Sequence, residues 1–160
     1  MIRFYNSLTK KKEDFVPITK GKVKLYTCGP TVYDNAHIGN FRTFLFEDFL
    51  KRTLLALGYD VYHVMNITDV DDKTINKSNI EKKSLREITD YYISSFKDDL
   101  NSLSILPSDQ LPRATDHVDQ MIKMIQALID KGCAYVTDDG SVFFSIDSYE
   151  NYGVLSNIDM

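Results

Sequence analysis

The spacing of apolar residues changes twice within the first half of the chain. Residues 22–28 form a β-rich run that a glycine-proline pair ends, which is typical of a strand. Apolar side chains then recur at helical spacing over residues 40–57, and residues 59–67 return to an extended pattern. Strand, helix and strand in this order predict a βαβ unit with two parallel strands.

Two more helices are expected farther along the chain. Residues 84–87 have the composition of a capping box, and apolar residues continue at helical spacing up to Leu103. Another helix is expected to start at Thr115 or Asp116 and to be closed by Gly132. Its apolar stripe, which we expect to be buried, consists of Val118, Met121, Ile122, Ile125, Leu128 and Ile129.

The remaining segments predict two hairpins and a linker. Residues 1–8 and 15–18 are expected to be extended on either side of a lysine-rich, solvated turn. Residues 134–136 and 142–146 flank Asp-Asp-Gly, which is a strong hairpin turn. Residues 106–115 hold two prolines in a polar setting and predict a linker.

The loop between the first strand and the first helix is suited to a nucleotide. A loop at the carboxyl end of a parallel strand that leads into a helix N-terminus offers free N–H groups and positive dipole to a phosphate. His37 can donate a hydrogen bond to a phosphate oxygen, and Gly39 lets the backbone approach a ligand because it has no Cβ.

Composition narrows the class of protein. The chain has 160 residues, 43% of them hydrophobic and 26% charged, which is enough for a domain with a core and argues against disorder. No apolar run is long enough to predict a membrane span, and two distant cysteines predict no disulfide framework, so a cytoplasmic protein is expected. The net charge of -4 provides no general attraction to nucleic acid.

Longer motifs surround the loop. Residues 26–43 read Tyr-Thr-Cys-Gly-Pro-Thr-Val-Tyr-Asp-x-x-His-Ile-Gly-x-x-Arg-Thr, and residues 65–73 read Met-Asn-Ile-Thr-Asp-Val-Asp-Asp-Lys. The chain closely resembles the cysteinyl-tRNA synthetases, a family of class I aminoacyl-tRNA synthetases. The likeness extends through Pro-Arg-Ala-Thr, Lys-Gly-x-Ala-Tyr and Tyr-Gly-x-Leu-Ser to residue 156. One position departs from the family, which usually has His-Ile-Gly-His where this chain ends the signature with Asn40.

The resemblance implies an α/β fold. Residues 1–105 are expected to form the N-terminal half of a Rossmann-type catalytic domain with a parallel sheet, and residues 106–160 the start of a connective insertion of helices and a β-hairpin. The rest of the catalytic domain, a second phosphate-binding loop and the tRNA-binding regions are expected beyond residue 160. The 160 residues alone are therefore expected to be inactive.

The resemblance also implies an activity and a set of residues. The family activates L-cysteine with ATP and transfers it to tRNA(Cys), and we expect a monomer that has no membrane partner. His37, Asn40 and Thr31 are the expected catalytic residues. The residues expected to bind ATP are Gly29, Pro30, Thr31, His37, Gly39 and Asn40, with Gly39 under the adenosine.

Cysteine itself is expected to meet Cys28 and Thr68. In the family, the cysteine that matches Cys28 is one ligand of a zinc ion that receives the substrate thiolate, a soft ligand that such a metal favours over a hydroxyl. A zinc site needs about three protein ligands, so the others are expected beyond Met160. Mg²⁺ is expected to accompany ATP as a phosphate-bound ion.

Three other functions remain open on the sequence. A ligase that joins cysteine to an amino sugar would share the same adenylate-forming half. A stand-alone nucleotidyltransferase with a His-x-Gly-His signature fits the length but not residues 28–31 or 66–73. An RNA-binding fragment without catalysis would need a basic stripe and an aromatic platform, which the sequence does not predict.

Overall fold

The computed structural model describes residues 2–158 and separates into two compact units. The larger unit is Pro17–His117, and the other consists of the residues before and after it. The larger unit contains the predicted βαβ arrangement and is described first.

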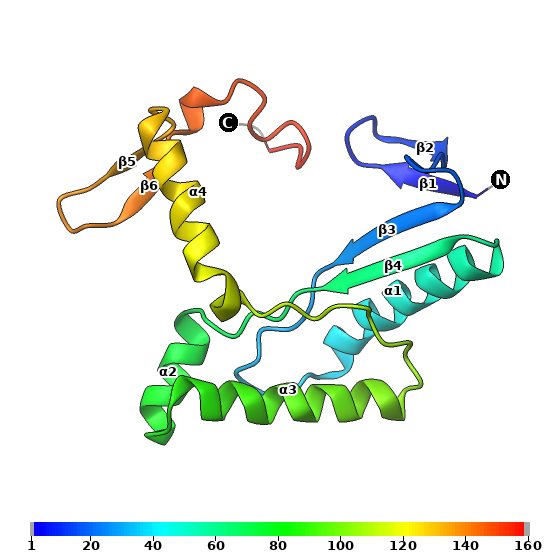
Figure 1. Ribbon diagram of the computed structural model, residues 1–160, viewed down its shortest axis with the longest axis horizontal. Helices are drawn as coiled ribbons and strands as arrows, with labels where there is room; N and C mark the ends of the chain where they lie inside the picture. Colours follow the sequence, from blue (N-terminus) through cyan, green and yellow to red (C-terminus); the bar gives the residue numbers. More distant parts are fainter. Residues whose placement is uncertain (1, 159–160) are drawn as a thin grey trace. The chain divides into compact units, whose positions relative to one another are not determined.

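A parallel pair of strands lies at the centre of the larger unit. Strands β3 (Lys22–Thr27) and β4 (Asp60–Met65) are parallel, with Lys22 opposite Asp60 and Thr27 opposite Met65 (Figure 1). Helix α1 (Ile38–Ala56) connects them. The predicted βαβ unit and the α/β fold class are confirmed.

Residues 106–115 are not the free linker that their two prolines suggest. Val64 pairs with Gln110 and Ile67 pairs with Arg113, both in the parallel sense. The carbonyl of Pro112 accepts the Ile67 N–H at 2.8 Å, so the lack of an N–H on proline does not matter on this outer position. The segment therefore extends the parallel sheet beside β4, whereas the expected division of the catalytic half from an insertion at residue 106 stays a prediction.

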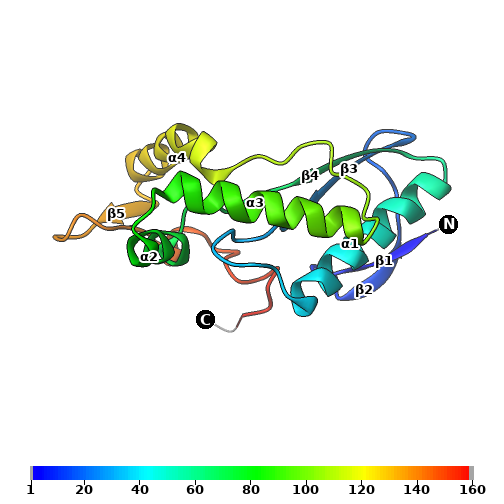
Figure 2. The same ribbon diagram turned by 90° about the horizontal axis from the view of Figure 1, so that it is seen from below.

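Helices α1 and α3 (Leu85–Ser102) share one core with the sheet. Helix α2 (Asp72–Glu81) follows β4, and α3 begins at the predicted capping box, in which Ser84 and Glu87 bond each other. Figures 1 and 2 show α1 and α3 on the same side of the β3–β4 pair. The Phe44 and Phe96 rings meet there at a centroid distance of 5.0 Å. The buried apolar cluster comprises Val32, Phe41, Phe44, Met65, Ile67, Ile88, Tyr92, Ile93, Phe96 and Ile105.

Helix α1 is apolar on more than the face it buries. Phe41, Phe44 and Leu54 are buried, but Phe46 and Phe49 are 68% and 69% exposed. The sequence places apolar residues at helical spacing along this helix, and within the described residues only some of them are buried.

Polar side chains are buried between α1 and the sheet. The Thr27 Oγ1 lies 2.9 Å from the His63 Nε2, and Glu47 is 8% exposed beside them on α1. Burial raises the pKa of Glu47, against the opposite effect of a hydrogen bond from Thr27. Burial also lowers the pKa of His63.

The second unit begins with a small hairpin. Strands β1 (Arg3–Asn6) and β2 (Lys11–Asp14) pair antiparallel. The lysine run therefore lies largely in a strand rather than in the expected turn, which is formed by residues 7–10. Because β2 is exposed along its whole length, charged residues suit it as well as they would suit a turn.

The rest of the second unit contains a helix and a second hairpin. Helix α4 (Val118–Asp130) is followed by β5 (Ala134–Val136), β6 (Val142–Phe144) and the 3₁₀ turn η2 (Ile146–Ser148), and the predicted second hairpin is confirmed. A 3₁₀ turn that belongs to the larger unit, η1 (Ala114–His117), precedes α4 in the chain. The expected burial of the α4 stripe is wrong for the described residues, because none of its side chains is buried. No helix among residues 2–158 is long and apolar enough to cross a membrane.

Candidate active site

A cavity of about 400 Å³ lies at the carboxyl ends of the two parallel strands. Its wall is formed by the loop after β3, the start of α1 and the start of α2. The lining residues are Cys28, Gly29, Pro30, Thr31, Tyr33, Asp34, Asn35, Ala36, His37, Asn40, Thr43, Phe44 and Lys73. Six of the eight site residues expected from the sequence are among them, and the exceptions are Gly39 and Thr68.

Gly29 sets the path of the chain as it leaves β3. Its N–H donates to the Asn66 Oδ1 at 3.1 Å. A Cβ at this position would lie 1.8 Å from the Asn66 backbone oxygen, so no other residue fits without moving the end of β4. The glycine therefore lets the two strand ends approach each other beneath the cavity.

Thr68 supports the loop from behind. Its N–H donates to the Pro30 oxygen at 3.0 Å, and its carbonyl accepts from Val32 at 3.1 Å. Thr31 and Thr68 thus form a parallel bridge that continues the pairing past the strand ends. Thr68 is not on the cavity wall, and its expected contact with cysteine stays a prediction.

His37 caps helix α1, which begins at Ile38, two residues before the predicted start. The His37 Nδ1 accepts the Gly39 N–H at 3.0 Å, and its carbonyl accepts from Asn40 at 2.9 Å. An Nδ1 that accepts carries no proton, so in the neutral ring the proton is on Nε2. His37 therefore has an N–H donor on the nitrogen away from the helix, where a ligand in the cavity can use it.

Asn40 completes the same cap. Its Oδ1 accepts the His37 N–H at 3.1 Å, which is the reciprocal bond of a capping box. The amide NH₂ is left to donate to a ligand. Asn40, in the last place of the His-Ile-Gly signature, thus makes one hydrogen bond to the start of the helix. It also offers a neutral donor on the cavity wall.

The structure shows why position 39 is a glycine, for a reason that the sequence did not reveal. A Cβ on it would lie 2.9 Å from the Cε1 and 3.0 Å from the Nδ1 of His37. Real contacts of a Cβ are longer, so a side chain here would displace the imidazole. Gly39 holds the space for His37, and its expected place under adenosine stays a prediction.

Cys28 does not make a metal site with the residues around it. Its thiol is exposed, and its Sγ lies 3.7 Å from the Gly29 oxygen. In residues 2–158, no group of three His, Cys, Asp or Glu side chains could hold a metal ion. The residues present therefore do not fit a complete zinc site, and the role of Cys28 as one ligand stays a prediction.

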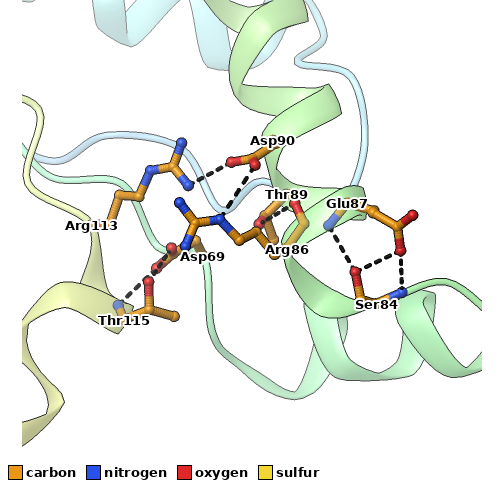
Figure 3. Close-up of polar contacts among 8 residues, drawn as sticks. All are labelled: Asp69, Ser84, Arg86, Glu87, Thr89, Asp90, Arg113 and Thr115. Atoms are coloured by element: carbon orange, nitrogen blue, oxygen red, sulfur yellow. Dashed lines mark hydrogen bonds and ion pairs between the residues drawn. The ribbon is translucent and has the colours of Figure 1, made fainter.

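The acidic run after β4 is structural in two of its positions. Asp71 is the N-cap of α2 and accepts the Thr74 N–H at 2.9 Å. Asp69 is 2% exposed and accepts from the N–H and hydroxyl of Thr115 at 2.9 and 2.6 Å (Figure 3). These bonds fix the end of β4 to the start of η1.

A second tie reaches from the same segment to α3. The Arg113 Nη1 donates to the Asp90 Oδ1 at 2.5 Å, and the Arg86 Nε lies 3.6 Å from the other oxygen of Asp90 (Figure 3). The Pro-Arg-Ala-Thr motif therefore joins this segment to α3 and to Asp69, and none of its residues lines the cavity.

Seven of the thirteen lining residues were not expected from the sequence as site residues, and Tyr33 and Lys73 are two of them. Tyr33 lies within the loop, and Lys73 lies in the first turn of α2, with its Nζ 5.2 Å from the Tyr33 ring centroid. The sequence did contain a signal for Lys73 as a site residue, because it is the last residue of the motif at residues 65–73. Its place on the wall depends on the turn between β4 and α2, which the sequence pattern did not predict as a helix start.

Known proteins resemble the chain over nearly its whole length. The family model described as "tRNA synthetases class I (C) catalytic domain" matches residues 14–160. A protein of Chlamydia trachomatis named cysteine–tRNA ligase is 56% identical over 156 residues, which is 98% of this chain and 32% of that protein. One of the same name from Staphylothermus marinus is 50% identical over 155 residues, 97% of this chain and 32% of that protein.

A solved structure has a similar fold. It is the ternary complex of the Agrobacterium radiobacter LeuRS with tRNA and LeuAMS, with a TM-score of 0.63 and 26% identity over 76% of this chain and 16% of that chain. The chain spans about a third of the length of the curated relatives it matches. From the family model and these relatives together, we conclude that the chain belongs to the class I (C) tRNA synthetase catalytic domains, of which it is an N-terminal part.

Proposed function

We propose that the complete protein containing this chain activates L-cysteine with ATP and transfers the cysteinyl group to tRNA(Cys). The relatives carry the name cysteine–tRNA ligase at 50–56% identity. The single observation that supports the chemistry is the cavity between the carboxyl ends of parallel strands and the start of α1, lined by His37, Asn40 and Thr31.

The residues of this chain would act on the phosphates. In activation, a carboxylate oxygen of cysteine attacks the α-phosphorus, a bond to phosphorus forms, and the bond to the bridging oxygen of pyrophosphate breaks. Such displacements depend on positioning and on stabilising negative charge. The Nε2–H of His37, the amide NH₂ of Asn40 and the Thr31 hydroxyl would donate to phosphate oxygens, and the positive end of α1 would add to their effect.

At the cysteine end, Cys28 and Thr68 would approach the substrate from β3 and β4. We derive no step through a metal, because the residues around Cys28 do not make up a site for one. Transfer then breaks the mixed anhydride as a 3′-terminal hydroxyl of tRNA(Cys) attacks the cysteinyl carbonyl and AMP leaves. The proposal also includes that the complete protein is a monomer in the cytoplasm.

The test uses the complete protein and measures cysteine-dependent ATP–pyrophosphate exchange and tRNA charging. We expect exchange with cysteine, little with serine, and charging of tRNA(Cys). A His37→Ala variant should lose at least about tenfold in kcat/KM for exchange, with Ile38→Ala, an exposed neighbour on the same turn, as the matched control. Exchange that is absent from the wild-type protein, or charging of an amino sugar in place of tRNA, would overturn the proposal.

A further inference from the structure

One lysine side chain lines the wall of the candidate active site. Lys73 is the only lysine or arginine among the cavity-lining residues of the described chain. It comes from the start of α2 after β4, whereas most of the wall is the loop after β3. Its side chain is exposed, so its charge is available to a ligand.

The position of Lys73 is a poor one for helix stability. It is the second residue of α2, where the unsatisfied N–H groups already concentrate positive charge. A cation in the first turn is repelled by the helix dipole, and acidic residues such as Asp72 are favoured there. Stability of α2 therefore does not explain a lysine at this place.

Tyr33 holds the ammonium group over the loop. The Lys73 Nζ lies 5.2 Å from the centroid of the Tyr33 ring, within the range of a cation–π contact. Tyr33 itself is half-buried and belongs to the same loop as Thr31. The ring thus limits where a long, flexible side chain can place its charge, and that place borders the cavity.

The rest of the wall lacks a fixed positive charge. Asn40 is neutral, and His37 uses its Nδ1 as the acceptor of the helix cap. Asp34 adds a carboxylate, although its Oδ1 is engaged by the Asn35 N–H at 2.8 Å. An anionic substrate would therefore depend on Lys73 for a full opposite charge from this part of the chain.

We propose that Lys73 binds the anionic oxygens of the substrate in this cavity, with Tyr33 as the residue that positions it. This inference rests on the proposed function. The two anions of that reaction are the phosphates of ATP and the carboxylate of the amino acid, and both present the same chemistry to an ammonium group.

The experiment measures ATP–pyrophosphate exchange by the complete protein with Lys73→Gln, Lys73→Arg and Tyr33→Leu variants. Lys97→Gln is the matched control, because Lys97 is exposed on α3 and lies outside the cavity wall. For Lys73→Gln we expect kcat/KM to fall at least about tenfold, which is about 1.4 kcal/mol. Lys73→Arg should retain most of the activity, and Tyr33→Leu should show an intermediate loss.

Separate titrations identify the anion. A rise in KM for ATP assigns the phosphates, and a rise in KM for cysteine assigns the carboxylate. A second measurement, ATP binding by calorimetry at two salt concentrations, should show a weaker salt dependence in Lys73→Gln than in the wild type if the phosphates are the partner. A residue that acted only on the fold would leave both KM values and the salt dependence unchanged.

Two results would overturn the inference. One is a Lys73→Gln protein whose exchange is within threefold of wild type and of Lys97→Gln. The other is a loss of exchange that comes together with a lower thermal midpoint of unfolding and that the Lys73→Arg variant does not restore. If the wild-type protein shows no cysteine-dependent exchange, the proposed function fails instead, which keeps the two outcomes apart.

Discussion

At the scale of single residues, the start of α1 combines two requirements in three positions. His37 must cap the helix and also present a donor to the cavity, and Asn40 must return a hydrogen bond to His37. Gly39 satisfies both by leaving room for the imidazole. Helix capping and ligand binding therefore involve the same three residues. A substitution that keeps the helix stable but alters the ligand contact can separate stability from activity.

Gly39→Ala is the clearest case. Alanine favours a helix over glycine by up to about 1 kcal/mol, so we expect the free energy of unfolding to change by less than about 1 kcal/mol in either direction. The new Cβ displaces His37, so kcat/KM for exchange should fall at least about tenfold. Exchange kinetics and urea unfolding of the complete protein check this, and a fully active Gly39→Ala enzyme would show that the position of the imidazole does not matter.

Asn40→Asp separates the same two properties in another way. The carboxylate keeps an acceptor for the His37 N–H and places negative charge in the first turn, which stabilises a helix by about 0.3–1 kcal/mol. It also removes the amide donor and repels phosphate. We expect an unchanged or higher thermal midpoint together with a KM for ATP raised about tenfold, an effect that should shrink at high salt. An unchanged KM for ATP would contradict a phosphate-facing Asn40.

At the scale of elements, the contact between α1 and the sheet includes charge as well as apolar packing. Phe44 and Leu54 are buried on the same helix as Glu47 and Lys51. The Lys51 Nζ donates to the Pro107 oxygen at 2.7 Å, which ties the outer segment of the sheet to α1. Glu47 lacks such a partner for one of its oxygens among the described residues.

The buried Glu47 makes stability depend on pH. Burial raises its pKa in the folded protein, so the folded state holds the proton more tightly than the unfolded chain does. Its contribution is fully present below the unfolded pKa, near 4.5, and is lost as pH rises through the higher folded pKa. Glu47→Gln should therefore have a higher thermal midpoint than wild type at pH 7.5, and this gap should close toward pH 4.5.

Glu87→Gln provides the control of opposite sign. The Ser84 hydroxyl lowers the pKa of Glu87, so that carboxylate stabilises above its unfolded pKa and loses the effect as pH falls. Its glutamine variant should be less stable than wild type at neutral pH. Thermal midpoints of the three proteins across pH 4.5–7.5 check both signs, and a Glu47→Gln gap that widens on acidification would refute the assignment.

At the scale of the whole molecule, the larger unit leaves one edge of its sheet and one side of helix α1 uncovered among the described residues. Within residues 2–158, no other named strand pairs with β3 on the side away from β4. Phe46 and Phe49 lie three residues apart on one face of α1 and are exposed. The chain spans about a third of the length of the curated relatives it matches. We expect an open strand edge and exposed aromatic rings to be places where other polypeptide can pack.

Residues 1–160 purified alone should therefore be inactive in exchange and should associate as concentration rises. An unpaired strand edge and exposed aromatic rings both promote association. Phe46→Ser combined with Phe49→Ser should reduce it without loss of helical circular dichroism, whereas Ser94→Ala, an exposed change on α3, should not. Sedimentation over a range of concentrations tests this, and a monomer at every concentration would contradict it.

The sequence by itself determined the parts of the structure that local physics controls. Hydrophobic period, the Ser84 capping box and the Asp-Asp-Gly turn placed most strands and helices, since each depends on neighbours within a few residues. The motif residues Cys28, Thr31 and His37 pointed to the loop that lines the cavity, because a strand that leads through a loop into a helix places such residues at one sheet edge.

Only the tertiary structure decided what depends on segments far apart in the chain. Residues 109–114 became a third parallel segment because β4 offered them a partner, which no pattern around Pro107 and Pro112 contains. Lys73 reached the cavity because β4 ends beside β3, and Gly39 proved necessary for His37 through a contact of side-chain volume. Pairing and packing at long range are set by the three-dimensional positions of atoms, which the spacing of residue types does not specify.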